Sequence, residues 1–204
     1  MTAPRPSRRP PVGARKGELR ERQLLDAAEA VLAERGYAQM TVNDIAAAAG
    51  ITRSALYFYF GSKQDVVTAL VRRTTDALQE ESVAALAESS EPDAVIATAL
   101  ERTALLWREH GVVMRAAVDL GSTIPEIGDL WTHAAASLIE AIAGVLIRAG
   151  IQPGDGPGDA PALAAALCWM IERSFYQASK TSVDALDRAQ LTCQVAWRRI
   201  ALPH

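Results

Sequence analysis

The stretch TVNDIAAAAGITRSALYFYFGSK, residues 41–63, predicts two short helices joined by a tight turn. Thr41, with Asp44 three residues later, is the pattern of a capped helix start, in which the hydroxyl accepts a free backbone N–H. Gly50 ends this helix because glycine takes the positive φ of a helix exit, and Thr52 caps the second. Such a pair is a helix-turn-helix, whose second helix enters the DNA major groove. The alternative is an ordinary alanine-rich helical hairpin.

The second helix of this pair carries side chains suited to nucleic acid. Its first turn, the part of a recognition helix that reaches base edges, holds Thr52, Arg53 and Ser54. An arginine can bind guanine through two hydrogen bonds, and a serine hydroxyl can bond to most bases. Tyr57 and Tyr59 each offer a hydroxyl to a phosphate. The next helix opens with a lysine, and a cation beside the free amide donors of a helix start suits a phosphate.

Residues 18–70 resemble the signature of the TetR family of transcriptional regulators. A first helix ends in ERGY and is followed at fixed spacing by TVNDIA, AGI, LYFYF and SK. Many members have His where this chain has Tyr59, so we expect a different preference at that position. The resemblance implies phosphate contacts at Thr41, Tyr57 and Lys63, and base or backbone contacts at Thr52, Arg53, Ser54 and Tyr59.

Composition predicts a globular, all-α chain. Hydrophobic residues make up 50% of the 204 residues, which excludes a disordered protein, and glycine and proline are sparse between residues 14 and 149. No uninterrupted apolar stretch reaches the roughly 18 residues of a membrane span. The start, MTAPRPSRRPPVGARKG, lacks the apolar core of a secretory signal. Cys168 and Cys193 fall in predicted helices and are interpreted as small core residues, so we expect a cytoplasmic protein.

The net charge of −3 is divided unevenly along the chain. Residues 1–63 hold ten Lys or Arg against six Asp or Glu, whereas residues 64–204 hold eleven against eighteen, so the two parts carry +4 and −7. A basic N-terminal third followed by an acidic remainder is the charge distribution expected of a DNA-binding head joined to a separate domain. We expect a disordered basic arm over residues 1–16, which could also contact DNA, a helix-turn-helix domain over residues 17–63, and a ligand-binding and dimerisation domain over residues 64–204.

Three helices in the head and six in the body are expected, which is the plan that the TetR resemblance implies. Gly111 is interpreted as a break between two of the body helices, and GIQPGDGPGDAP, residues 150–161, as a surface loop. The helix that begins at Lys63 links the head to the body. The expected helix ranges are 18–35, the two helices of the turn motif, 63–87, 92–109, 112–120, 125–149, 162–179 and 183–202.

The body is expected to hold a small molecule. All four tryptophans lie beyond the head, and large aromatic and thioether groups in a helical bundle can line an apolar cavity. The alternative is that these residues fill a core, but TetR-like bodies usually hold an effector. The predicted ligand-binding residues are Trp107, Met114, Trp131, Trp169, Met170, Arg173 and Tyr176.

Two stretches of the body, IPEIGDLW (residues 124–131) and WMIERSFYQASK (residues 169–180), resemble a mycobacterial subgroup of the family, the repressors of an ethionamide-activating monooxygenase. Where that subgroup implies asparagines this chain has Cys168 and Ile171, which predicts a drier wall and a more apolar ligand. Glu172 and Arg173 are adjacent on a helix and do not face each other. Each is therefore either exposed or paired elsewhere, or makes a polar contact in the pocket.

The last two helices are predicted to form a homodimer, because their apolar positions exceed what one face of a small bundle buries. Two copies would give a four-helix interface with two-fold symmetry, and two heads would read a palindromic site together. The predicted interface residues are Leu163, Ala166, Leu167, Leu186, Ala189, Cys193 and Trp197.

An enzyme is the main rival class. HExxH, CxxC, GxSxG and P-loop spacings are absent, and His110, His133 and His204 do not supply the Glu-x-x-His pairs of a di-iron bundle. We therefore expect no catalytic site, metal or cofactor. The expected function is a repressor released from double-stranded operator DNA by an apolar small molecule. The alternative is a helical small-molecule-binding or adaptor protein without specific DNA binding.

Overall fold

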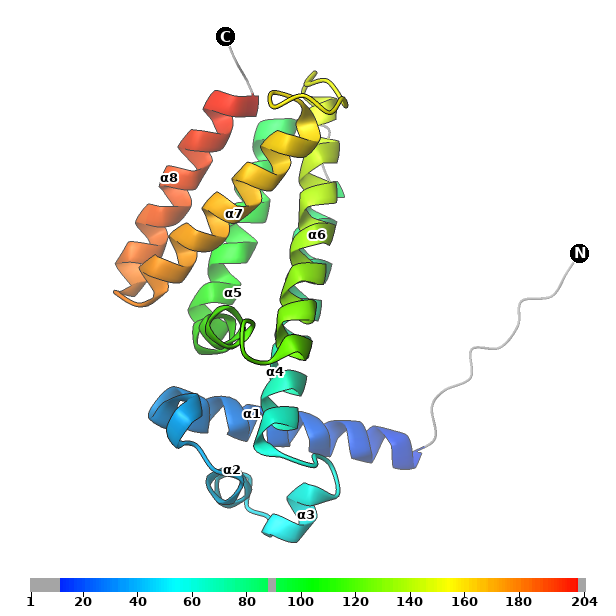
Figure 1. The fold of residues 1–204 in the computed structure, drawn as a ribbon, viewed down its shortest axis with the longest axis vertical. Coiled ribbons are helices and arrows are strands. Elements are labelled where there is room, and N and C mark those ends of the chain that lie inside the picture. Colours follow the sequence, from blue (N-terminus) through cyan, green and yellow to red (C-terminus); the bar gives the residue numbers. More distant parts are fainter. Residues whose placement is uncertain (1–11, 88–90, 202–204) are drawn as a thin grey trace, which may run out of the picture. The chain divides into compact units, whose positions relative to one another are not determined.

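The computed structural model describes residues 12–87 and 91–201, which form α-helices and no β-strand, as the all-α prediction requires (Figure 1). The eight helices of this part of the chain are α1 (Val12–Gln39), α2 (Val42–Ala48), α3 (Arg53–Tyr57), α4 (Lys63–Ala87), α5 (Pro92–Leu120), α6 (Pro125–Arg148), α7 (Ala160–Ser179) and α8 (Val183–Ala201).

The predicted helices 92–109 and 112–120 form one element, α5, so the described residues hold eight helices where nine were predicted. The predicted break corresponds to a kink inside α5 at His110, whose φ of −119° and ψ of 22° are not helical. Gly111 is buried, and a Cβ at this position would lie 3.8 Å from the Cβ of Ser179 at the end of α7. Gly111 therefore directly follows the kink and lies in ordinary contact with the end of α7.

The chain divides into two compact units, and the boundary between Leu70 and Val71 falls inside α4. This boundary lies later than the predicted one because the first turns of α4, with Val66 and Val67 fully buried, belong to the first unit. At the other end, α1 begins at Val12, so the last residues of the predicted arm are helical. The remainder of the arm, residues 1–11, lies outside the described residues.

The helix-turn-helix in the first unit is built from the local signals in its sequence. Thr41 caps α2 together with Asp44, and both hydrogen bonds of the predicted capping box are present. Gly50 has a φ of 63° and turns the chain after α2. Thr52 then caps α3 by accepting a 3.2 Å hydrogen bond from the Ala55 amide. The core of this unit is apolar and includes Leu24, Met40, Ile45, Leu56 and Phe60.

The second unit is a bundle in which α5 contacts α6, α7 and α8, and α7 contacts both α6 and α8. Trp107, Phe175 and Trp197 are among the large side chains buried in its core. Helix α6 is long and apolar enough to cross a membrane by length and composition. Because α6 packs against two helices of the bundle, we interpret its apolar surface as a packing surface.

Candidate functional site

Most of the side chains predicted to contact DNA are exposed on α3 and at the start of α2. The buried side chain of Leu56 attaches α3 to the core of the first unit, so the opposite side of this short helix is left to solvent. Tyr59 and Lys63 are half-buried, and the other predicted residues are exposed. The exposed members are Thr41, Thr52, Arg53, Ser54 and Tyr57.

Arg53 and Tyr57 form a pair one turn apart on α3. The Arg53 guanidinium donates a 3.0 Å hydrogen bond to the Tyr57 hydroxyl, and its Cζ lies 5.3 Å from the centroid of the Tyr57 ring. A guanidinium carries five N–H donors in a rigid plane. The pair therefore holds the Arg53 side chain in one orientation and leaves most of its donors for another acceptor.

Thr41 is already engaged in hydrogen bonds within the protein. Its hydroxyl donates to Asp44 Oδ2 at 2.7 Å and accepts from the Asp44 amide at 3.2 Å. The bond that the Thr41 hydroxyl donates, with a further one from the Thr41 amide, holds the pKa of Asp44 below its ordinary value, and the charge of Arg35 acts in the same direction. A phosphate contact through the Thr41 hydroxyl would have to compete with this capping box.

Lys63 is also engaged within the first unit. Its ammonium group donates a 2.8 Å hydrogen bond to the Tyr37 carbonyl oxygen and lies 4.4 Å from the centroid of the Tyr37 ring. Tyr37 follows Gly36, whose φ of 70° turns the chain inside α1. Because an ammonium group has three donors, the predicted phosphate contact requires the two that Tyr37 does not use.

Phe58 is a surface residue that the predicted site does not include. Its side chain is 84% exposed, the most of any large hydrophobic side chain in the described chain. Its ring packs edge-on against Tyr59, with 5.4 Å between the ring centroids. The sequence could have predicted this exposure. If Leu56 and Phe60 point inward from one side of a helix, Phe58, midway between them, points outward. Because Phe58 is exposed at the end of α3 and contacts Tyr59, we add it to the candidate surface.

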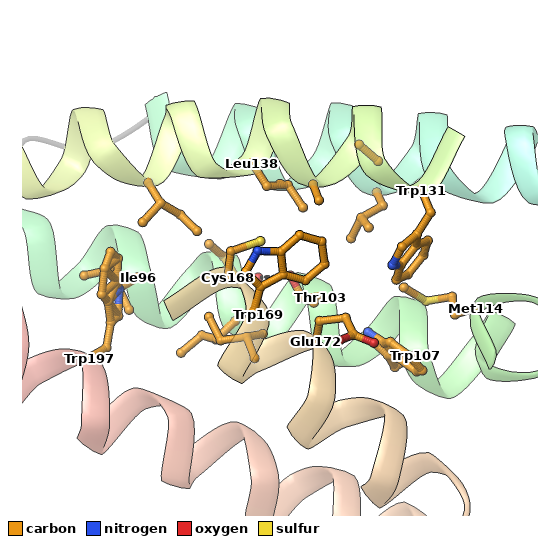
Figure 2. A pocket seen from close by; sticks show the side chains of 17 residues that line it. Ile96, Thr103, Trp107, Met114, Trp131, Leu138, Cys168, Trp169, Glu172 and Trp197 are labelled. Atoms are coloured by element: carbon orange, nitrogen blue, oxygen red, sulfur yellow. Dashed lines mark hydrogen bonds between the residues drawn. The ribbon is translucent and has the colours of Figure 1, made fainter. Parts of the chain in front are cut away.

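A cavity lies within the second unit, between α4, α5, α6, α7 and α8 (Figure 2). Its volume is about 80 Å³ and its wall is almost entirely apolar. All four tryptophans contribute to it, and Trp169, which is 44% exposed, lies at its rim. Of the predicted ligand-binding residues, Trp107, Met114, Trp131 and Trp169 line the cavity.

Met170, Arg173 and Tyr176 do not line this cavity, so the structure does not bring them together with the other four. Arg173 is 58% exposed, and its guanidinium stacks 4.9 Å from the centroid of the Tyr176 ring. The Tyr176 hydroxyl donates to Asp119 and accepts a 2.6 Å hydrogen bond from Lys180. These side chains form a separate polar group at the C-terminal end of α7.

Helix α7 instead presents Cys168, Ile171 and Glu172 to the cavity. Cys168 and Ile171, the two residues from which a drier wall was predicted, both line the cavity. Burial raises the pKa of Cys168 to about 11, and the neighbouring Glu172 acts in the same direction. Its thiol therefore stays protonated and unreactive at neutral pH.

Glu172 brings a carboxylate into the apolar wall, although Arg173 was the predicted polar contact. Its side chain is 13% exposed, and Oε1 is buried without a hydrogen-bond partner among the residues that the structure describes. The other oxygen, Oε2, lies 3.9 Å from Arg173 Nε. Burial raises the pKa of Glu172, and the charge of Arg173 offsets part of this effect.

The predicted dimer residues fall into two groups. Leu167, Leu186, Cys193 and Trp197 are buried within the single chain, and Trp197 lines the cavity, so they pack inside the bundle and do not form its outer surface. Leu163 and Ala189 are half-buried and Ala166 is exposed. The large apolar side chains that α7 and α8 expose are Trp169, Val183, Leu191 and Val195.

Comparison with known proteins adds independent observations on both units. Residues 24–70 match the family model of bacterial regulatory proteins of the tetR family, and residues 96–196 match that of the C-terminal domain of the transcriptional regulator EthR. The chain is 32% identical over 181 residues to the HTH-type transcriptional regulator EthR of Mycobacterium tuberculosis, and this match covers 86% of the chain and 82% of that relative.

Two further similar proteins match different fractions of this chain. An uncharacterized HTH-type transcriptional regulator of Mycobacterium tuberculosis is 34% identical over 117 residues, a match that covers 57% of this chain and only 56% of that relative. The crystal structure of a TetR-like transcriptional regulator from Rhodococcus sp. RHA1 has a TM-score of 0.68 and 26% identity. That match covers 96% of this chain and 100% of the Rhodococcus chain.

Proposed function

We propose that this chain, which belongs to the TetR family of bacterial regulatory proteins, is a sequence-specific DNA-binding transcriptional regulator whose DNA affinity is set by a small molecule bound in the cavity. The observation that carries the proposal is the exposure of Thr52, Arg53, Ser54 and Tyr57 on α3 of a capped helix-turn-helix. The matched relatives are transcriptional regulators, not enzymes, in agreement with the prediction of no catalytic site.

The proposed DNA contacts divide by chemistry. Arg53, with its planar set of donors, would read base edges in the major groove, and guanine is the base that this geometry suits. Thr52 and Ser54 would supply further contacts at the start of α3. Tyr57, Tyr59 and the free donors of Lys63 would bind phosphates, which position a protein on DNA without reading its sequence.

The proposed assembly is a homodimer on double-stranded operator DNA. One α3 spans only a few base pairs, so two heads related by two-fold symmetry would read two halves of a palindromic operator. The exposed apolar side chains Trp169, Leu191 and Val195 on α7 and α8 support an interface on that side of the bundle. The exposed Ala166 would also contribute to this interface, whereas the half-buried Leu163 and Ala189 pack against the core of the bundle.

The proposed switch depends on α4, because the boundary between the two units lies within this helix. Leu78 of α4 lines the cavity, so a ligand there contacts the helix that continues into the head. A ligand shifts the equilibrium only by its different affinity for two arrangements of the protein. We propose that ligand binding favours the arrangement with lower DNA affinity, so that the protein is a cytoplasmic repressor released by its effector.

The test is DNA binding measured by fluorescence anisotropy, with fragments upstream of the protein's own gene and of its neighbours. A specific regulator binds one fragment much more tightly than a shuffled fragment of equal length. Its affinity also falls steeply as salt is raised, because phosphate contacts release counterions. Equal, sequence-independent binding to all fragments would instead favour the alternative, a small-molecule-binding or adaptor protein.

A further inference from the structure

A single charged side chain interrupts the apolar wall of the cavity. Among the described lining residues Glu172 alone is acidic or basic. Its Oε1 atom is buried and has no hydrogen-bond partner in the described part of the chain. A buried carboxylate oxygen without a partner is costly, and such a group in a native protein indicates a missing partner.

Arg173 does not supply that partner. Its Nε atom lies 3.9 Å from Oε2, the other carboxylate oxygen of Glu172, which is too far for a hydrogen bond. Its guanidinium instead stacks on the Tyr176 ring, away from the cavity lining, and the side chain is 58% exposed. The missing partner of Oε1 is therefore to be sought on the cavity side of Glu172.

The cavity has two chemically different ends. Figure 2 shows Glu172 toward the end where Trp107, Met114 and Trp131 are placed, whereas Trp197 and Ile96 lie at the opposite end. Indole rings attract cations through their negative faces, and aromatic side chains are a common lining for ammonium groups. The end that holds the Glu172 carboxylate and the indoles of Trp107 and Trp131 therefore suits a positive charge. The far end, with Trp197 and Ile96 and no charged side chain among its described lining residues, suits an apolar chain.

We propose that the cavity binds an elongated molecule with one ammonium group and an apolar tail, and that the Glu172 carboxylate contacts the ammonium group. This inference rests on the proposed function, since it names the class of effector for the same cavity, and it replaces the purely apolar ligand expected from the sequence. A neutral apolar molecule would leave Oε1 unpaired, and an anion would meet a like charge. An ammonium group would also favour the ionised carboxylate, against the effect of burial.

The test uses three probes of equal chain length, octylammonium, octanol and octanoate. Each is titrated at pH 7 into the full chain without DNA, below its micellar concentration, and the Kd is measured by tryptophan fluorescence and by calorimetry. The expected order is octylammonium tightest, by about tenfold over octanol, because its N–H groups can donate to the Glu172 carboxylate, with octanoate weakest. In Glu172→Gln the Kd of the cation should rise by about tenfold while the Kd of octanol stays the same.

Glu140→Gln is the matched control, because Glu140 is an exposed acid on α6 that does not line the cavity. It changes the net charge equally and should leave all three affinities unchanged. Equal binding of octylammonium and octanol to the unsubstituted chain would overturn the inference, as would an unchanged cation Kd in a folded Glu172→Gln protein. Because these titrations contain no DNA, their failure is distinct from a failure of sequence-specific DNA binding, which would instead contradict the proposed regulator.

Discussion

The Lys63 ammonium group donates to the Tyr37 carbonyl oxygen at 2.8 Å and lies over the Tyr37 ring, with 4.4 Å to its centroid. This contact joins the last turn of α1 to the first residue of α4. Lys63 therefore has a structural role besides the phosphate contact that its position in the motif implies. Loss of this side chain should affect folding as well as DNA binding.

Lys63→Ala should lower the free energy of unfolding by roughly 1.5–3 kcal/mol, the usual range for a hydrogen bond to a charged group, and should weaken binding to all DNA sequences alike. Tyr37→Phe is the matched control, because it keeps the carbonyl oxygen and an aromatic ring and should change stability little. Urea unfolding followed by circular dichroism measures the first effect and fluorescence anisotropy the second. Unchanged stability in Lys63→Ala would show that the contact with Tyr37 does not stabilise the head.

Arg53→Ala should reduce sequence discrimination, since a guanidinium that binds a base through two hydrogen bonds contributes about 1–3 kcal/mol of it. Tyr57→Phe removes the hydroxyl that Arg53 contacts at 3.0 Å but keeps the ring beneath the guanidinium. Because this hydroxyl is proposed to bind a phosphate, its loss should weaken binding to operator and shuffled DNA equally. Anisotropy titrations with both fragments separate the two results. If Arg53→Ala also weakened both fragments equally, Arg53 would be a backbone contact.

Phe58→Ala should leave stability almost unchanged, because the side chain is 84% exposed, and should weaken DNA binding. Leu56→Ala provides the contrast from the same helix: Leu56 is fully buried, and such a truncation usually costs about 2–5 kcal/mol. Thermal unfolding with anisotropy titrations measures both variants. Full DNA affinity in Phe58→Ala would remove this residue from the proposed interface.

Gly128→Ala should destabilise the second unit. A Cβ at Gly128 would lie 2.5 Å from the Gly121 carbonyl oxygen, a backbone atom that cannot move without shifting the turn before α6. Gly144 lies in the same helix, and the nearest atom to a Cβ there is a side-chain nitrogen of Arg148 at 3.7 Å. Gly144→Ala should therefore be neutral or stabilising by up to about 1 kcal/mol, since alanine favours a helix. Equal melting temperatures for the two variants would contradict the close contact.

Features that depend on neighbours in sequence were predictable. Thr41 and Asp44 of the capping box are three positions apart, and the turn after α2 depends on the positive φ of Gly50 alone. Local sequence therefore determines both the start and the end of α2. The contact between Lys63 and Tyr37 joins residues 26 positions apart. A contact between residues so far apart in sequence depends on tertiary packing, which the sequence motif does not show. The motif therefore predicted a DNA contact for Lys63 but not its contact with Tyr37.

Helical periodicity does not predict which residues of α7 and α8 line the cavity. Glu172 and Arg173 differ by one position, about 100° around a helix, and an apolar sequence on several sides of α7 does not say which side faces the cavity. The same ambiguity placed Trp197 and Leu167 in a dimer interface, although both are buried in the single chain. In a helix that is apolar on most sides, the arrangement of the neighbouring helices decides which residues line a cavity.

Glu172→Gln should stabilise the protein at neutral pH, and the gain should shrink in acid. Burial raises the pKa of Glu172 above its ordinary value of 4.5, so the folded state disfavours the ionised carboxylate. The unfavourable contribution of Glu172 to folding stability is absent below the pKa of the unfolded chain. It grows as the pH rises toward the higher pKa of the folded protein and is complete above that value. Glutamine does not titrate and has no such contribution.

The measurement is the difference in melting temperature between Glu172→Gln and the unsubstituted chain, at intervals from pH 4 to pH 8. Asp44 and Asp93 have lowered pKa values, so their stabilising contributions are lost as the pH falls. Because both proteins share these groups, their effect cancels in the difference. The expected difference is positive near pH 8 and smaller near pH 4. A difference independent of pH would mean that the pKa of Glu172 is the same in the folded and the unfolded protein, so that burial does not disfavour its ionised form.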